Sequence, residues 1–266
     1  MIRNANDINA EQIKVITKRN ETPFFKSSYL FLKQINGLRP GRLHVIMGTT
    51  GSGKSTLVRS ILCDHLRQNS SMAYAWLSEE SSEDLIVSLA KQGISENDRS
   101  KLVIESELEN DGAPVAMILK RAEAHGAKLL LIDNLTTSPQ YDNESPNVQK
   151  GIVKQIKDFA HRTKIAVLIV VHTKKDISDN YSKLITEADV RGNAAITMNA
   201  EFFYIMQRMT LQTTIYPTIK IVKHRNQDPT DKVFYLKYDS KERAYPSDRA
   251  ITFEDFKLAF NARNKL

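Results

Sequence analysis

One glycine-rich octapeptide constrains this 266-residue chain more than any other feature. It reads Gly48-Thr49-Thr50-Gly51-Ser52-Gly53-Lys54-Ser55 and fits the pattern G-x-x-x-x-G-K-[ST]. Because it follows the apolar run Leu43 to Met47 and precedes a segment of helical period, we expect it to join a strand to a helix. In such a loop the backbone N–H groups surround phosphate oxygens, Lys54 reaches the β and γ phosphates, and the Ser55 hydroxyl completes a magnesium shell. The octapeptide therefore predicts a site for a nucleoside triphosphate with Mg²⁺, with the neighbouring Thr56 as a further nucleotide-binding residue.

Short apolar runs alternate with segments of helical period along the first two thirds of the chain. The expected strands are Leu43 to Met47, Met72 to Leu77, Leu102 to Glu105, Leu129 to Asp133 and Ile165 to His172. The expected helices between them are Lys54 to Leu66, Glu83 to Lys91, Val115 to His125 and Val148 to Thr163. Strands without polar alternation are buried on both faces, so we predict an α/β fold with a mostly parallel central sheet flanked by helices.

The pattern changes after Arg191. The runs Glu201 to Met206, Ile215 to Val222 and Lys232 to Tyr238 are separated by turns and not by helices, so we predict an antiparallel extension of the sheet. A last segment, Thr252 to Ala262, spaces three phenylalanines for one face of a helix.

The N-terminal segment up to about residue 42 stands apart from the alternating pattern. Asp7 to Arg19 has isoleucines at helical spacing, and Pro23 interrupts that spacing. This helix packs either on its own domain or on a neighbouring subunit.

The charge indicates the class of binding partner, and the cysteine content indicates the cellular compartment. The net charge of +7 and the pI near 9.3 favour a polyanionic partner. The single cysteine, Cys63, has no partner for a disulfide and falls in an expected buried helix, which indicates a reducing compartment. Since no run approaches the roughly 20 apolar residues that span a bilayer and the N-terminus lacks the apolar run of a secretory signal, we expect a soluble cytoplasmic protein with no membrane contact.

Two carboxylate positions follow expected strands. Asp133 ends a buried strand about 80 residues after the glycine-rich loop, where an acid can hold the magnesium through water. Glu79 and Glu80 follow the strand that ends at Leu77. One of these two carboxylates, with Glu79 preferred, would deprotonate the attacking water, and the alternative is a solvated cap on the helix that starts near Ser82.

A histidine and two basic segments also follow strands. His172 either senses the γ-phosphate or is an ordinary core or capping histidine. The loop after it carries Lys174, Lys175 and Lys183, which either contact DNA phosphates or form a polar surface. Lys223-His224-Arg225 is either solvated surface or the place of an arginine finger that acts on a neighbour's site.

In this order, the motifs resemble the RecA-fold motor domain of the DnaB-like replicative ring helicases of superfamily 4, and most closely the helicase half of phage primase-helicases. The resemblance covers about residues 37 to 240. Besides the glycine-rich loop, the matching pieces are Trp76-Leu77-Ser78-Glu79-Glu80-Ser81, Leu131-Ile132-Asp133-Asn134-Leu135, Val170-Val171-His172, Asp189-Val190-Arg191-Gly192 and Ile221-Val222-Lys223-His224-Arg225.

The resemblance implies a RecA-like P-loop NTPase that works as a hexameric ring on single-stranded DNA. We expect an N-terminal linker or oligomerisation helix (1–36), a motor domain (37–250) and a C-terminal helix (251–266), and the resemblance implies that the early helix docks on the next protomer. A separate primase, loader or polymerase is an expected partner.

Site roles also follow from the resemblance. It makes Glu79 the catalytic base, His172 the phosphate sensor, Arg225 the finger acting in trans, and Lys223 its companion on the same phosphate. It places Arg208 and Tyr238 on the two sides of the nucleotide base, which is chemically reasonable because a guanidinium and a phenol ring both stack on a π-face.

The chain departs from the family at one coupling position. The family has a glutamine shortly after the Asp-x-Arg-Gly motif, and this chain has Ile196-Thr197-Met198-Asn199 in that segment. Two alternatives to a helicase follow: a strand-exchange recombinase of the same fold, and a regulatory or scaffolding ATPase that does not unwind DNA.

Overall fold

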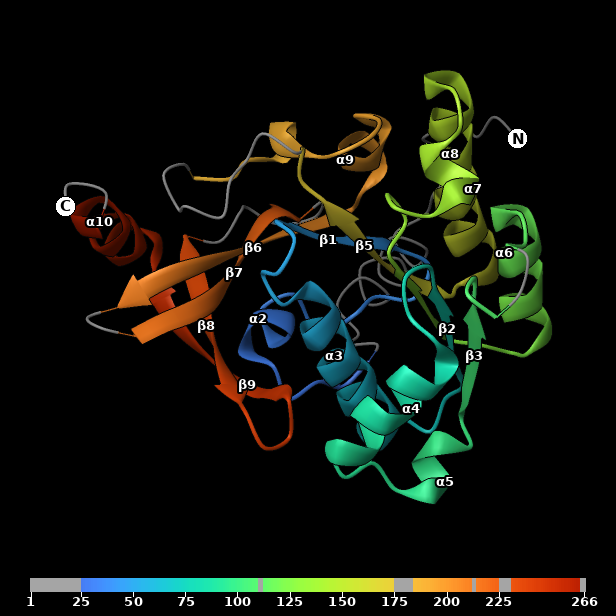
Figure 1. The fold of residues 1–266 in the computed structure, drawn as a ribbon, viewed down its shortest axis with the longest axis horizontal. Coiled ribbons are helices and arrows are strands. Elements are labelled where there is room, and N and C mark those ends of the chain that lie inside the picture. Colours follow the sequence, from blue (N-terminus) through green and yellow to red (C-terminus); the bar gives the residue numbers. More distant parts are fainter. Residues whose placement is uncertain (1–24, 110–111, 175–183, 212–213, 225–230, 264–266) are drawn as a thin grey trace, which may run out of the picture.

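A computed structural model describes residues 25–109, 112–174, 184–211, 214–224 and 231–263. Within these residues the chain forms one nine-stranded sheet in the order β3-β2-β4-β5-β1-β6-β7-β8-β9 (Figure 1). Its strands are β1 (Leu43–Gly48), β2 (Ala73–Leu77), β3 (Leu102–Ser106), β4 (Leu129–Asp133), β5 (Ala166–His172), β6 (Phe202–Leu211), β7 (Thr214–His224), β8 (Lys232–Asp239) and β9 (Ala244–Thr252). The predicted α/β fold with a mostly parallel sheet is confirmed.

The first six strands of that order are parallel to one another, and their carboxyl ends lie at one edge. Gly48 of β1 pairs with His172 of β5, and Leu77 of β2 pairs with Asp133 of β4. Every residue of β1, β2 and β4 is buried, as their uninterrupted apolar sequences predict. The pairing therefore brings the ends of four strands together where the functional residues are expected.

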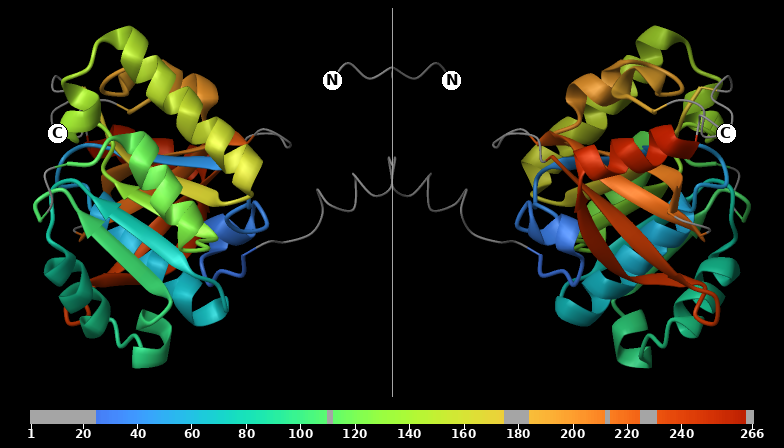
Figure 2. Two further views of the ribbon diagram at one scale, coloured as in Figure 1. Left: turned by 90° about the vertical axis from the view of Figure 1, so that its right-hand side faces the viewer. Right: turned by 90° about the vertical axis from the view of Figure 1, so that its left-hand side faces the viewer.

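Helices cover both faces of the parallel strands (Figure 2). One face packs against α3 (Lys54–Gln68) and α4 (Ser82–Lys91), and the other packs against α6 (Val115–Ala124) and α8 (Pro146–Thr163). The strands alternate between the two cores: Ile46 belongs to the first, and Val45 and Met47 belong to the second. Shorter helical segments are α2 (Leu30–Lys33), α5 (Glu96–Arg99), α7 (Pro139–Asp142), η2 (Glu187–Asp189) and α9 (Ala195–Asn199).

The remaining strands form the expected antiparallel extension, with two differences from the sequence prediction. β6 pairs in parallel with β1 and antiparallel with β7, so it is the strand at which the direction changes. β9 was not predicted, because this edge strand is largely exposed and carries Pro246 and charged residues in place of an apolar run. The C-terminal helix α10 (Phe253–Arg263) packs on these strands through Phe256 and Phe260.

The expected helix from Asp7 to Arg19 lies outside the described residues. Among the helices that the structure does describe, none is long and apolar enough to cross a bilayer.

Candidate nucleotide site

The glycine-rich loop runs from the end of β1 to the start of α3, as its sequence predicts. Gly51 and Gly53 have positive φ angles of 75° and 97°, which a residue with a side chain rarely adopts. Gly48 needs its missing side chain for a different reason, since a Cβ there would overlap the carbonyl oxygen of Met206 on β6. The loop thus presents backbone N–H groups at the N-terminus of a 15-residue helix, where an anion is favoured.

Lys54 and Ser55 begin that helix. The buried Lys54 side chain donates from Nζ to the carbonyl oxygen of Thr49 at 2.6 Å, inside the loop. The Ser55 hydroxyl lies near the carboxyl group of Asp133, the last residue of β4, and stabilises its charged form. Burial raises the pKa of Asp133, while Ser55, Arg59 and Lys54 lower it.

The Ser55 and Asp133 oxygens suit a small divalent cation. Both are hard oxygen donors, and Mg²⁺ in nucleotide sites takes one or two protein ligands and completes its shell with phosphate oxygens and water. Among the described residues no cluster of three or more acidic, histidine or cysteine side chains offers a self-sufficient metal site. The residues present therefore fit a cation that arrives with a nucleotide.

The structure separates the two adjacent glutamates. Glu79 lines the pocket beside the glycine-rich loop, and its Oε2 accepts a hydrogen bond of 3.0 Å from the Asn134 amide. Glu80 forms an ion pair with Arg59 of α3 instead. Neither glutamate caps α4, because the Ser81 hydroxyl accepts from the Asp84 N–H at that helix start. Glu79 is therefore the carboxylate that faces the phosphate end of the pocket.

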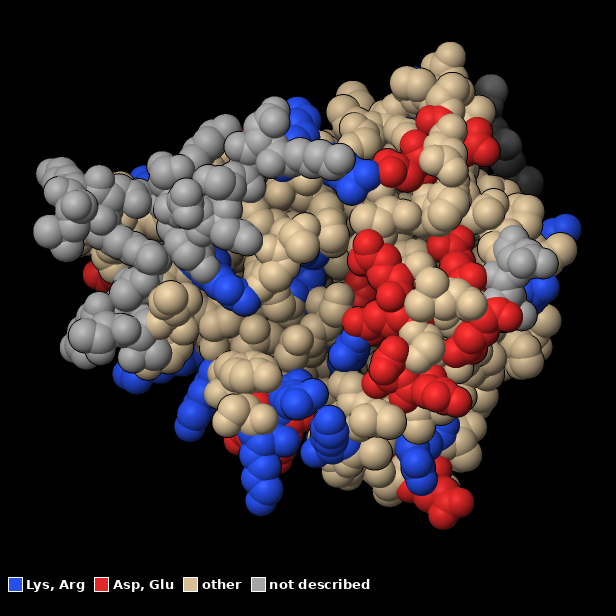
Figure 3. Space-filling view, in the orientation of Figure 1, with Lys and Arg blue, Asp and Glu red and all other residues tan. Residues whose placement is uncertain are grey.

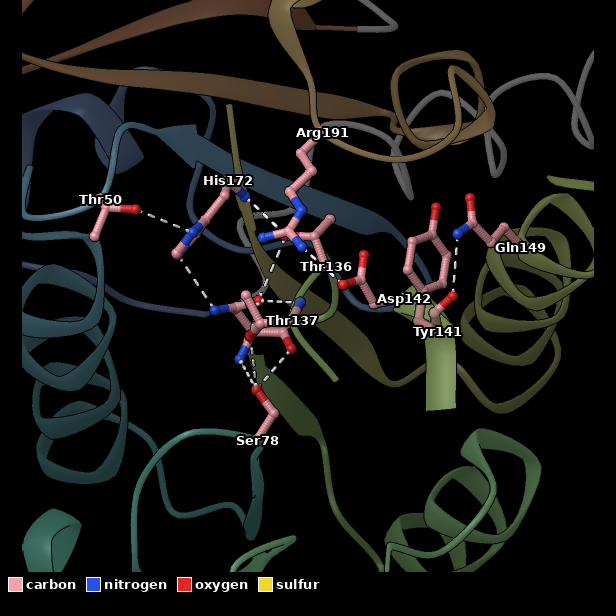
Figure 4. A network of polar contacts seen from close by, with 10 residues as sticks. Thr50, Ser78, Thr136, Thr137, Tyr141, Asp142, Gln149, His172 and Arg191 are labelled. Atoms are coloured by element: carbon pink, nitrogen blue, oxygen red, sulfur yellow. Dashed lines mark hydrogen bonds and ion pairs between the residues drawn. The ribbon is translucent and has the colours of Figure 1, made fainter. Parts of the chain in front are cut away.

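His172, at the end of β5, lies between the loop and β4. Its Nδ1 is 3.4 Å from the Thr50 hydroxyl, and its Nε2 is 3.3 Å from the Asn134 amide nitrogen (Figure 4). Burial, with smaller contributions from Lys54 and Arg191, lowers the pKa of His172 to about 4. The imidazole is consequently neutral at physiological pH.

A pocket of about 680 Å³ joins these groups to side chains of the antiparallel strands, and this size is ordinary for a cofactor site. Its lining is Thr50, Gly51, Gly53, Lys54, Ser55, Thr56, Glu79, His172, Arg208, Ile215, Pro217, Tyr238 and Tyr245. Arg208 donates to the carbonyl oxygen of Gly51. The Tyr238 ring is half exposed and meets the Tyr245 ring edge-on at 5.5 Å between centroids.

The sequence prediction missed Ile215, Pro217 and Tyr245 of the pocket lining, and also Asn134, which contacts two of the site residues. Tyr245 lies on β9, the strand that was not predicted, and its hydroxyl occupies the space that a Cβ on Gly53 would need. Asn134 was noted only as part of a motif, although it contacts both Glu79 and His172. Its position directly after Asp133 is the one sequence signal that points to it.

Several predicted residues lie elsewhere. The Lys174 ammonium donates to the carbonyl oxygen of Ala188 at 2.9 Å, beside the base of its own loop. Lys223 lies within β7 and not after it, and its Nζ donates to the carbonyl oxygen of Thr197 at 2.8 Å. Neither lysine lines the pocket. Lys175, Lys183 and Arg225 lie outside the described residues.

Charges are separated on the face of the molecule that carries the carboxyl ends of the strands. Figure 3 shows acidic side chains gathered over the ends of β2 and β3, and basic side chains over β8 and β9. The pocket lining itself combines an acidic residue, Glu79, with the basic residues Lys54 and Arg208. Like charges repel, so the acidic region disfavours contact with a polyanion.

Comparison with known proteins agrees with this geometry. A family profile described as an AAA domain matches residues 33–178. A solved DnaB-like replicative helicase, described together with its interactions with primase, superposes with a TM-score of 0.74 at 14% identity, covering 93% of this chain and 67% of that one. A KaiC-like protein, PH0186 from Pyrococcus horikoshii OT3, superposes with a TM-score of 0.62 at 14% identity, covering 85% and 97%.

No curated protein matches the sequence. The two structural similarities establish the fold, which is that of the RecA-like NTPases. Because the family profile spans more than half of the 266 residues, the chain belongs to the AAA domain family.

Proposed function

We propose that the chain is the motor of an ATP-dependent DNA helicase, a hexameric ring that moves along single-stranded DNA and shares each hydrolytic site between two subunits. One observation carries the proposal. Among the described residues that line the pocket, the charged donors are Lys54 and Arg208, and Arg208 is held by the carbonyl oxygen of Gly51. Phosphoryl transfer also needs a cation against the charge of the transition state, so the pocket is suited to an arginine from a neighbouring copy.

The groups needed for hydrolysis come from this chain. The loop N–H groups and Lys54 would bind the phosphates, and Ser55 and Asp133 would hold Mg²⁺, which would supply charge neutralisation at the phosphates. Glu79 accepts a proton from the attacking water, because its carboxylate faces the phosphate end of the pocket. Arg208 and Tyr238 border the opposite end, where the base would stack.

The loop between β5 and β6 is proposed to contact DNA. Its first part begins directly after His172 and is closed by a bridge between Thr173 and Val190. Arg191 donates its backbone N–H to the carbonyl oxygen of His172 at 2.8 Å. A displacement of this loop by DNA would therefore also shift His172, which lies beside the phosphate loop.

The decisive assay measures ATP hydrolysis with and without single-stranded DNA, together with displacement of a strand from a forked duplex. We expect DNA-stimulated hydrolysis and displacement. Formation of joint molecules would favour a recombinase instead. Electron microscopy with nucleotide should show closed rings of six subunits.

A regulatory or scaffolding ATPase is the second candidate, and one observation favours it. Where the family has a glutamine, helix α9 presents Met198, whose side chain is 77% exposed. Hydrolysis that responds to DNA without strand displacement would support this candidate. In either case a separate primase or loader remains a proposed partner, and we expect the protein in the cytoplasm.

A further inference from the structure

Asn134 is buried, and its amide group has a defined orientation. The amide oxygen accepts from the Thr137 N–H at 2.8 Å and from the Thr137 hydroxyl at 2.7 Å. Since only the oxygen of an amide accepts hydrogen bonds, these two donors identify it. The amide nitrogen therefore points in the other direction, toward Glu79 at 3.0 Å and His172 at 3.3 Å. Its two hydrogens match these two contacts.

The orientation of Asn134 also fixes the tautomer of His172. Because the Asn134 nitrogen can only donate, the Nε2 atom of the imidazole must accept. The proton of the neutral ring is then on Nδ1, which faces the Thr50 hydroxyl at 3.4 Å. The low pKa of His172, about 4 and caused mainly by burial, keeps the ring neutral, so that it carries a single proton.

A continuous chain of hydrogen bonds results, here called the Asn134 link: Thr50, His172, Asn134 and Glu79. It starts in the phosphate loop and ends at the carboxylate that faces the phosphates. Figure 4 shows Thr50 and His172 at one end of it, beside the group of Ser78, Thr136 and Thr137. The Ser78 hydroxyl donates to the Asn134 carbonyl oxygen at 2.9 Å, and the His172 N–H donates to the Thr136 hydroxyl at 3.0 Å. The hydroxyl groups of Ser78 and Thr136 therefore fix the backbone of Asn134, directly after β4, and of His172, at the end of β5.

We propose that Asn134 is a positioning residue that ties the Glu79 carboxylate to the His172 imidazole. A shift of His172, caused by a γ-phosphate or by the loop that follows it, then changes the direction of Glu79. This inference rests on the proposed hydrolytic function and adds to it the route by which DNA contact reaches the base. It assigns a role to a residue outside the pocket lining.

The first test measures the protonation of the His172 ring and does not depend on ATP hydrolysis. In ¹⁵N NMR spectra of the full chain, with His172 assigned by comparison with a His172→Gln variant, His172 should carry its proton on Nδ1. In Asn134→Asp the carboxylate can only accept at neutral pH, so the proton should move to Nε2 or the ring should become doubly protonated. A proton on Nε2 in the natural chain, or no change in Asn134→Asp, would overturn the link.

The second test reads its effect on catalysis. In Asn134→Asp, kcat for hydrolysis with single-stranded DNA should fall about 10- to 100-fold, the rate equivalent of one hydrogen bond to a charged group. KM should stay nearly constant, because Asn134 does not line the pocket. The matched control is Asn193→Asp, whose amide nitrogen donates to the Pro146 carbonyl oxygen away from Glu79 and His172. The control should keep its stimulation by DNA.

The outcomes separate the two proposals. If the natural chain is stimulated by DNA and Asn134→Asp is stimulated equally, the link is wrong and the proposed function stands. If the natural chain hydrolyses ATP without any response to DNA, but shows the expected tautomer and loses kcat in Asn134→Asp, the helicase proposal fails and the link between the phosphate loop and Glu79 stands.

Discussion

The parallel strands and the antiparallel strands contribute to one pocket in different ways. β1, β2 and β5 supply the phosphate loop, Glu79 and His172 from their carboxyl ends or from the residues just beyond, and β4 ends at Asp133 beside Ser55. β6 to β9 supply Arg208, Tyr238 and Tyr245 from positions within the strands. Because parallel strands all end at the same edge, residues that follow them in sequence meet in space. Antiparallel strands end at alternate edges, so no common position marks their pocket residues.

The difference also separates chemistry from recognition. In the proposed function, the parallel half would supply the phosphate, metal and proton-transfer groups, whereas the antiparallel half would supply rings and a guanidinium that border the base. Substitutions in the parallel half should therefore lower turnover, and substitutions in the antiparallel half should lower affinity.

Substitution of Arg225 gives the largest expected effect and tests the division between turnover and affinity. This arginine follows an antiparallel strand in sequence and is nevertheless proposed to act on turnover. In Arg225→Ala we expect hydrolysis to fall about 10³- to 10⁵-fold, as for the loss of an arginine finger, with nucleotide binding nearly unchanged. Phosphate release and nucleotide titration measure the two effects.

A mixing experiment shows where Arg225 acts. Combining Arg225→Ala with Glu79→Ala chains should restore part of the activity, because some subunit interfaces then pair an intact pocket of one chain with an intact arginine of the next. No recovery at any mixing ratio would contradict sharing of sites between subunits.

Glu79→Gln tests the parallel half directly. Removal of a general base should lower kcat about 10²- to 10⁴-fold, with little change in affinity. The matched control is Glu80→Gln, which removes the ion pair with Arg59 outside the pocket. An equal loss in the two variants would show that the structure does not distinguish these neighbours functionally.

Tyr238→Ala tests the antiparallel half. Stacking of a base on an aromatic ring is worth about 1–3 kcal/mol, so the Kd for nucleotide should rise roughly 10-fold while kcat at saturation stays unchanged. Fluorescent-nucleotide titration gives the Kd. Tyr238→Phe retains the ring and should bind nucleotide as the natural chain does. A loss of kcat without a loss of affinity in Tyr238→Ala would contradict the assignment of the antiparallel half to nucleotide affinity.

Gly48→Ala tests the junction of the halves, because its new Cβ would overlap the Met206 carbonyl oxygen of β6. We expect a loss of about 1–3 kcal/mol in the free energy of unfolding, measured by urea denaturation. Gly151→Ala is the control: Gly151 lies in helix α8 with open space around it, so alanine should stabilise the chain by about 0.5–1 kcal/mol.

The sequence alone determined the phosphate loop, the parallel strands with their helices, and the set of residues at strand ends. These features are local, because an apolar run or a glycine pattern is complete within a few consecutive residues. The uninterrupted apolar run of β4 and the acid that ends it were therefore predictable together.

Only the tertiary structure decided which of two adjacent glutamates faces the pocket, that Tyr245 lines it, and that Asn134 contacts Glu79 and His172. Glu79 and Glu80 differ by one position in sequence, and the pairing of Glu80 with Arg59 on another element separates them. Tyr245 reaches Gly53 across nearly 200 residues from an edge strand with little apolar pattern. Such contacts depend on how distant elements pack, and packing has no signature in any short stretch of sequence.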